Sequence, residues 1–225
     1  MTFSLVVRDG GRFGIAGSSS SPAVAARIAH LRPGVGAASS QNITDPTLGT
    51  DLLDALAEHG DAERALAGVT GAAHNEKTIA YRQLTVLGRS GPGFAYSGPH
   101  TLGTYASATA DGVVAAGNML SGKHIPGVLV EAYQEATGEL EERLIAAMKA
   151  AVAAGGEEGP VHSAGLAVVA DVGWRVTDLR IDWADEPIDR LGELLDVWLP
   201  QRDDYVTRGL DPASSPSYGV PGDAR

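Results

Sequence analysis

Thr2 is the first candidate for a catalytic nucleophile in this chain. Removal of Met1 would leave a free α-amine on a residue that also carries a hydroxyl. An α-amine has a pKa near ~8, so part of it is neutral and basic at physiological pH. A Thr hydroxyl with its own amine beside it is an activated nucleophile for acyl transfer. The alternative stays open: with Met1 retained, Thr2 is only a strand hydroxyl.

The stretch that Thr2 opens predicts a β-hairpin. Residues 2–9 and 12–18 are largely apolar, and the Asp9-Gly10-Gly11 cluster between them supplies the positive φ of a tight turn. A nucleophile on a rigid strand is held better than one on a frayed end. Ser18 ends the second strand, so we expect its hydroxyl beside the amine of Thr2; its alternative is a turn residue.

An acyl-transfer site also needs hydrogen-bond donors for the oxyanion. Gln41, Asn42 and Asn118 are the candidate donors. Asn118 follows a wholly apolar strand, and a polar amide there must find partners or a ligand. Its alternative is a loop amide that caps the next turn. We expect Gln41 and Asn42, together with His30, to contact the substrate.

Six segments in a fixed order carry a resemblance to a known family. They are Thr2-Phe3-Ser4-Leu5-Val6, Gly34-Val35-Gly36-Ala37, Ser40-Gln41-Asn42-Ile43-Thr44-Asp45-Pro46, Gly117-Asn118-Met119-Leu120-Ser121-Gly122, Ser163-Ala164-Gly165-Leu166-Ala167-Val168-Val169, and Tyr205 with Arg208 and Asp211-Pro212. Together they resemble a bacterial family whose domain has no assigned function and which has the fold of N-terminal-nucleophile (Ntn) hydrolases. One departure is His162, which stands where the family pattern has Gln.

The resemblance implies a four-layer αββα sandwich and an amidohydrolase that transfers the acyl group of a small linear amide to Thr2. It also places Ser18 where the proteasome-like branch has an Asp, and Arg27 where that branch has a Lys. A fixed cation near the Thr2 α-amine lowers the pKa of that amine. Arg27 keeps its own proton, so it could adjust this pKa but could not itself act as the base. His30 is the alternative to Arg27, and both residues could instead be solvated on an edge strand.

Two other functions remain open. The first is a non-catalytic small-molecule binding or assembly protein on the same scaffold. The second is a hydrolase that uses Ser or His elsewhere, although no GxSxG motif supports it. The six His show no metal-ligand spacing, and the glycine-rich turns do not open a helix in a βαβ unit, so we expect neither a metal nor a cofactor.

The order of predicted elements favours the same α+β fold, with two mainly antiparallel sheets and helices outside. After the hairpin come an apolar stretch over 23–31, a strand over 35–40, helices over 50–59 and 61–69, strands over 81–87, 94–96 and 113–116, a long helix over 128–152 broken at Gly138, strands over 162–171 and 174–183, and a helix from Pro187. The sequence of residues 99–112 indicates neither helix nor strand clearly. We expect one domain over 1–212 and a loose tail over 213–225.

Composition narrows the class of protein further. The chain has 225 residues, no Cys and a net charge of −11, which disfavours nucleic acid and anionic lipid as partners. No stretch of apolar residues is long enough to span a membrane. We expect a cytoplasmic protein, and a two-fold homodimer, because Leu194 and Trp198 on the last helix offer apolar surface.

Overall fold

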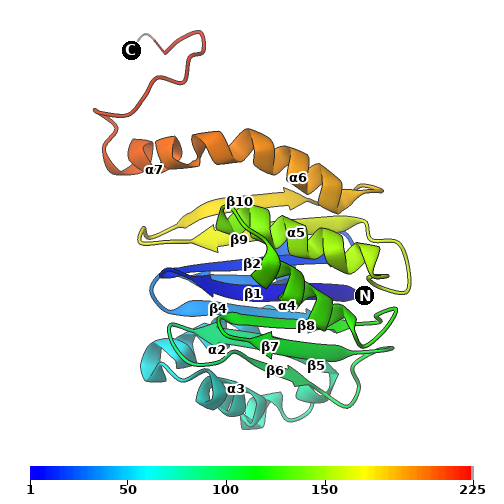
Figure 1. The fold of residues 1–225 in the computed structure, drawn as a ribbon. Helices are drawn as coiled ribbons and strands as arrows, with labels where there is room; N and C mark the ends of the chain where they lie inside the picture. Colours follow the sequence, from blue (N-terminus) through cyan, green and yellow to red (C-terminus); the bar gives the residue numbers. More distant parts are fainter. Residues whose placement is uncertain (224–225) are drawn as a thin grey trace.

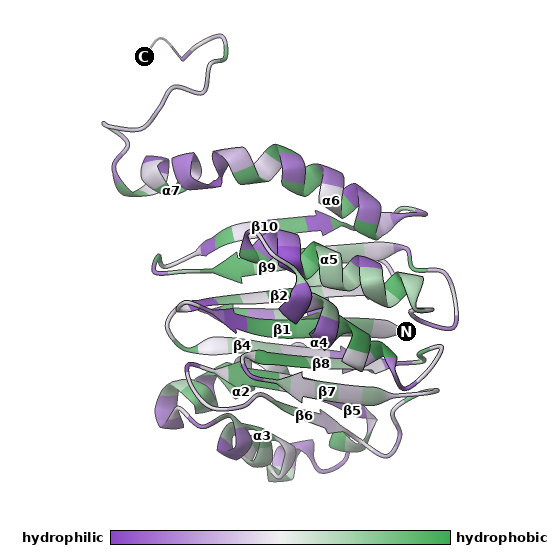
Figure 2. Cartoon of the chain, in the orientation of Figure 1, coloured by the Kyte–Doolittle hydropathy of each residue, from purple (hydrophilic) through white to green (hydrophobic). Residues whose placement is uncertain are grey.

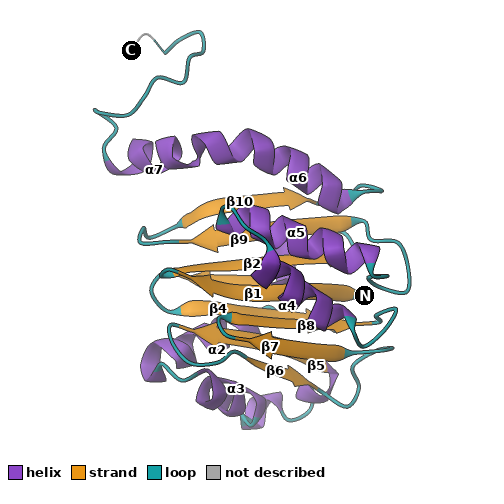
Figure 3. Ribbon diagram, viewed as in Figure 1, coloured by secondary structure: helices purple, strands orange, loops and turns teal. Residues whose placement is uncertain are grey.

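The computed structural model describes residues 1–223 and contains two β-sheets between layers of helices (Figure 1). One sheet has the strand order β10 (Arg175–Ile181), β9 (Ser163–Val169), β2 (Arg12–Ser19), β1 (Thr2–Asp9), β8 (Val113–Asn118) and β7 (Ala106–Ala110). The other has the order β3 (Ala29–Arg32), β4 (Gly36–Asn42), β5 (Arg82–Gly88) and β6 (Phe94–Ser97). All pairings between these strands are antiparallel, which confirms the predicted αββα sandwich (Figure 3).

The helices cover the outer faces of the two sheets. They are α1 (Ala25–Ile28), α2 (Thr47–His59), α3 (Ala62–Thr70), α4 (Ile125–Glu135), α5 (Leu140–Ala153), α6 (Pro187–Trp198) and α7 (Arg202–Leu210), with short 3-10 turns η1 (Ala73–Asn75), η2 (Ile79–Tyr81) and η3 (Leu199–Gln201). Helices α4, α5 and α6 pack on the six-stranded sheet, and α2 and α3 on the four-stranded sheet. The short α1 is the exception among the helices of residues 1–223, because it contacts β2 and β9 of one sheet and β4 of the other, between the two sheets.

Turn and cap residues set the ends of several elements. Gly10 and Gly11 have φ of 54° and 89°, as a two-residue hairpin loop requires. Gly60 ends α2 in the left-handed region and donates its N–H to the carbonyl of Leu56. Asp61 caps α3 by accepting from the N–H of Arg64. These local signals place the predicted elements correctly, although α2 begins three residues before the expected Thr50.

Three apolar clusters fill the spaces between the four layers. The sequence also predicts a core of nine apolar residues: seven of them are buried (Phe3, Leu5, Val7, Ile15, Val114, Leu166 and Val168), whereas Val35 and Ile181 are half-buried at the cluster margins. Side chains alternate across β1: Phe3 faces the helices, and Val6 faces the second sheet. Thr2 and Ser4 share the face of Val6, so the Thr2 side chain enters the space between the sheets.

The structure revises or completes the sequence prediction in several places. The apolar stretch over 23–31 divides into α1 and β3, and the undetermined stretch over 99–112 contains β7. Leu194 and Trp198 pack against the chain's own core, so the homodimer stays a prediction without that support. Within the tail, residues 211–223 contain no helix or strand; Arg208 donates to the carbonyls of Pro216 and Ser217. Residues 224 and 225 lie outside the described part.

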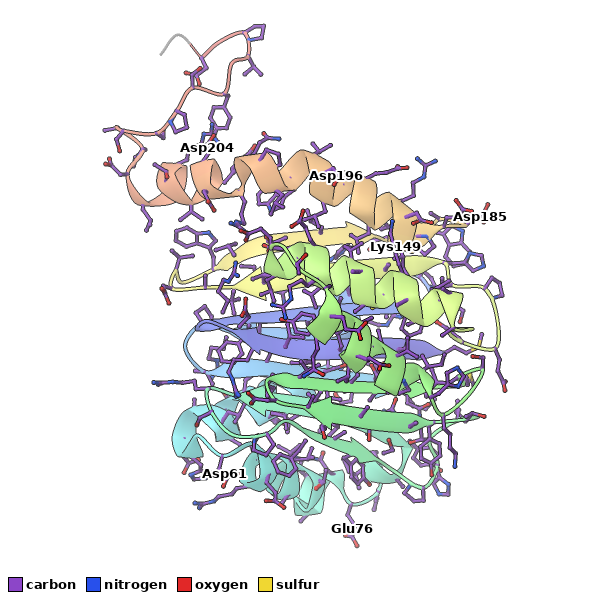
Figure 4. All side chains as sticks on the ribbon, in the orientation of Figure 1. Asp61, Glu76, Lys149, Asp185, Asp196 and Asp204 are labelled. Atoms are coloured by element: carbon purple, nitrogen blue, oxygen red, sulfur yellow. The ribbon has the colours of Figure 1, made fainter. Side chains whose placement is uncertain are left out.

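Within residues 1–223, Glu141 and Glu157 are the buried charged residues, and the other charged side chains reach the surface. Figure 2 shows the apolar residues concentrated on the strands and the inner sides of the helices. The acidic residues labelled in Figure 4 on α6 and α7, Asp196 and Asp204, lie on the outward side, as do Asp61 and Glu76 near α3. In the part of the chain that the structure describes, no helix combines the length and apolar character needed to cross a bilayer.

Candidate active site

The space between the two sheets changes from apolar to polar along the strands. At one end it is filled by Val6, Phe13, Ile15, Ala37, Leu87, Val114, Ala167 and Val169. At the other end, where β1 begins, the same faces carry Thr2, Ser4, Ser19, Ser39, Gln41, Gln83, Asn118 and Ser163, all buried. Buried polar side chains are stable only when they are hydrogen-bonded. This polar end of the inter-sheet layer, defined by these eight residues, is the candidate active site.

Thr2 lies at the open end of the site, between the neighbouring strands β2 and β8. Its Cα partner in β8 is Asn118, and cross-strand partners on one face have their Cβ atoms about 5 Å apart. Thr2 Oγ1 lies 3.3 Å from Ser19 Oγ on β2, and it donates to the carbonyl of Met1 at 2.5 Å. Ser19 Oγ donates to the same carbonyl. Two hydroxyls therefore converge on the carbonyl group that precedes Thr2.

A network of amide side chains lies beneath Thr2. Asn118 Nδ2 donates to Gln83 Oε1 at 3.0 Å, and Gln41 Nε2 donates to the same oxygen at 2.8 Å. Gln41 Oε1 accepts from Ser4 Oγ at 2.7 Å, and Gln83 Nε2 donates to the carbonyl of Gly117 at 3.0 Å. The network joins both sheets and fixes the Asn118 amide. One of the two Nδ2 protons of Asn118 is engaged by Gln83, so the second can serve a ligand.

Ser18 does not lie where the sequence suggested. It is the partner of Phe3 in the β1–β2 register, so its side chain faces the helical layer, where Ser18 Oγ donates to the carbonyl of Ser163 at 2.9 Å. Side chains alternate between the faces of a strand, so the next residue, Ser19, lies on the face of Thr2. Ser19 is the hydroxyl that contacts Thr2.

Arg27 is connected to Thr2 through two serines. It lies on α1 and not on a strand, and α1 packs against the sheet where Gly165 has no side chain: a Cβ there would lie 2.5 Å from Ala25 Cβ. Arg27 Nη2 donates to Ser21 Oγ at 2.8 Å, and Ser21 Oγ lies 2.9 Å from Ser19 Oγ. Its Nη1 donates to the carbonyls of Pro22 and Ala23. A chain of contacts through Ser21 and Ser19 therefore connects the guanidinium group to the Thr2 hydroxyl.

His30 and Asn42 lie away from Thr2. His30 is on the outer face of β3, where its ring packs against Gly49 of α2, and burial lowers its pKa. Asn42 ends β4 with a φ of 74°; its Nδ2 donates to the carbonyl of Tyr81 at 2.6 Å, and its Oδ1 accepts from the N–H of Leu102. Both residues hold loops and helices in place. Of the three expected substrate contacts, the structure brings only Gln41 into the network below Thr2.

His162 borders the site through its backbone. Its N–H donates to the carbonyl of Ser19 at 2.8 Å, and its ring stacks on Trp183 at a centroid distance of 4.5 Å. The side chain of Trp183 is largely exposed. The pair therefore forms part of the rim next to the Thr2 end of β1.

The family of the chain follows from its match to a family model. The model of a family of unknown function, DUF1028, matches residues 2–191. The chain belongs to this family. The crystal structure of protein SPO2555 from Silicibacter pomeroyi, described with the same family model, is 28% identical to it, with a TM-score of 0.79 over 87% of this chain and 88% of that chain. No curated protein matches the chain significantly.

Two further solved structures resemble the chain more distantly. HslV from Trypanosoma brucei is 15% identical, with a TM-score of 0.48 over 74% of this chain and 98% of that chain. The Anbu (Gly-1) mutant from Hyphomicrobium sp. strain MC1 is 12% identical, with a TM-score of 0.47 over 89% of this chain and 96% of that chain.

Five of the eight residues of this DUF1028 site were not predicted as site residues: Ser4, Ser19, Ser39, Gln83 and Ser163. Glu157, which lies outside these eight, was missed as well. Ser19 could have been found by counting outward from the two-residue turn, because that turn places it opposite Thr2. Gln83 lies among both polar and apolar residues of β5, so it gave no clear sign. Glu157 gave no sign, because its Glu-Glu pair reads as a solvated surface; in fact its side chain is 4% exposed. It belongs to the segment that follows α5.

The arrangement places a hydroxyl and an amide side chain close together, but among residues 1–223 the hydroxyl has no basic side chain as a recorded partner. Among the described residues, the recorded partners of Thr2 Oγ1 are the Met1 carbonyl and the Ser19 hydroxyl, neither of which is a base at neutral pH. A free α-amine on Thr2 would place a base beside this hydroxyl. That amine exists only when Met1 is absent.

Proposed function

We propose that this protein is an amidohydrolase of the Ntn type in which Thr2 is the nucleophile after removal of Met1. The observation that carries the proposal is the position of the Thr2 hydroxyl, at the head of a central strand and between the Asn118 amide and the Ser19 hydroxyl. Membership of the family supports it less directly, because that family has no assigned function.

The reaction would proceed in two acyl-transfer steps. The Thr2 α-amine takes the Oγ1 proton while Oγ1 attacks the carbonyl carbon of a small linear amide. Asn118 Nδ2 donates to the oxyanion, and the ammonium gives its proton to the leaving amine as the C–N bond breaks. Water, activated by the same amine, then hydrolyses the ester on Thr2 and releases the acid.

The state of the N-terminus gives the direct test of this function. Met1-free protein, made with a methionine aminopeptidase or from a cleavable fusion, should hydrolyse at least one member of a panel of small amides. Protein that retains Met1 should hydrolyse none, because the nitrogen of Thr2 is then an amide and cannot act as a base. Equal activity of the two forms would contradict the assignment. Inactivity of both forms across the panel would favour a non-catalytic binding protein.

Asn118→Ala should slow the acyl-transfer step in Met1-free protein by roughly two orders of magnitude, since one oxyanion donor is removed. Single-turnover kinetics would measure this step. Gln41→Ala removes a neighbour of the same network that does not adjoin Thr2 across the strands, so its effect on the same step should be clearly smaller. Similar losses in both variants would show that the network, and not the Asn118 donor, controls the rate.

A further inference from the structure

Glu157 is a buried carboxylate near the Met1 amine. Its side chain is 4% exposed, and within residues 1–223 neither Oε1 nor Oε2 accepts a hydrogen bond of good geometry, although Ser20 lies near the carboxyl. Burying a carboxylate without compensation is costly, so such a group is normally neutralised or bound. The mechanism proposed above does not use it.

Backbone contacts fix Glu157 beside the Thr2 end of β1. It forms an isolated bridge with Leu120, and the N–H of Glu158 donates to the carbonyl of Met119 at 2.9 Å. These contacts tie the segment after α5 to the residues that follow Asn118. Figure 1 shows this segment passing the edge at which the N-terminus lies.

Met1 occupies the space between Glu157 and the Thr2 hydroxyl. Its carbonyl accepts from Thr2 Oγ1 and Ser19 Oγ, and its Cε would lie 3.0 Å from a Cβ on Gly159. Burial raises the pKa of the Glu157 carboxyl to about 7, and the nearby Met1 α-amine and Ser20 lower it in part. Met1 therefore occupies the site as an aminoacyl group. Its carbonyl lies at the hydroxyls of Thr2 and Ser19, and its amine lies toward the Glu157 carboxylate.

We propose that Glu157 selects the substrate by binding a free α-ammonium group next to the scissile carbonyl, so that the preferred substrates are amides of α-amino acids. This inference rests on the proposed function, because the substrate fills the space that Met1 vacates. A substrate ammonium there supplies the charge-assisted hydrogen bonds that the carboxylate lacks. Ser20, near the carboxyl, offers a hydroxyl and an N–H but no charge, so a substrate ammonium group is the partner that would neutralise the carboxylate.

Binding of two matched ligands separates this inference from the function itself. The probe is L-methioninamide, and the control is its des-amino analogue, γ-(methylthio)butyramide. Met1-free protein carrying Thr2→Ala is used, so that neither ligand is consumed. We expect calorimetry to show a preference of about tenfold or more for L-methioninamide, in line with a charge-assisted interaction. Because binding is measured without turnover, failure of Thr2 as nucleophile would not alter this result.

Variants at two neighbouring positions complete the test. Adding Glu157→Gln should reduce the preference ratio to about one, whereas Glu158→Gln, at an exposed neighbour, should keep it. The ratio should also be largest between about pH 7 and about pH 8, where the carboxylate is ionised and the ligand amine, with a pKa near ~8, is still protonated. Equal binding of the two ligands by the parent, or binding of neither, overturns the proposal. Equal weakening of both ligands by Glu157→Gln also overturns it, because Glu157 would then serve the chain's own amine.

Discussion

Thr2→Ala in Met1-free protein is expected to reduce amide hydrolysis by roughly four orders of magnitude or more, because the attacking oxygen is lost and nothing else at the site replaces it. The substitution removes a hydroxyl and a methyl group from the end of a strand, so folding and ligand binding should change little. Steady-state kinetics with an amide found in the panel, together with a thermal unfolding curve, would measure both effects.

Thr2→Ser is the matched control for this loss. It retains the hydroxyl and the α-amine, and it lacks only the methyl group that restricts the χ1 angle of Thr. We expect part of the activity to remain. If Thr2→Ala hydrolyses the amide as fast as the parent, the nucleophile lies elsewhere and the proposed function is wrong.

Glu157→Gln is expected to stabilise the Met1-bearing protein at alkaline pH by up to about 3 kcal/mol, and to have little effect near pH 5. Burial raises the pKa of this carboxyl from 4.5 to about 7 in the folded chain. Below about pH 4.5 the group is neutral in both states. As the pH rises to about 7, Glu157 ionises in the unfolded chain but stays largely protonated in the native chain, which favours the unfolded state. The parent therefore loses stability over this range, whereas the Gln variant, which has no carboxyl there, does not.

Urea unfolding at about pH 5 and about pH 8.5 would measure this difference. Glu158→Gln is the control, because the side chain is exposed and its removal should give no such pH dependence. A stability gain that is the same at both pH values would mean that Glu157 is already satisfied as an ion. In that case the argument for a bound ammonium group would lose its basis.

The fold was predictable because its signals are local. The glycines of the hairpin turn, the Gly60 and Asp61 caps and the apolar stripes of the helices each act over a few residues. The order of strands and helices then limits the packing to two sheets with helices outside. The stretch over 23–31 was harder, because four residues of helix and four of strand are too short for a periodic pattern.

The site was only partly predictable, because it depends on register and on contacts between distant segments. A shift of one residue moves every side chain to the other face of a strand, and this separates Ser18 from Ser19. The pairing of Thr2 with Asn118 joins the two ends of a long stretch of chain, and no local pattern encodes it. The burial of Glu157 likewise follows from backbone contacts with residues 119–121.

The position of β1 between β2 and β8 has a consequence for the timing of maturation. β2 follows β1 after two residues, so the hairpin closes early, whereas β8 is synthesised much later and joins through a long loop closure. Until β8 arrives, one edge of β1 and the chain end are open to an aminopeptidase. Afterwards Met1 is half-buried against Ser19 and Gly159. We therefore expect removal of Met1 to compete with folding during synthesis, so that the speed of translation and processing sets the fraction of chains with a free α-amine on Thr2.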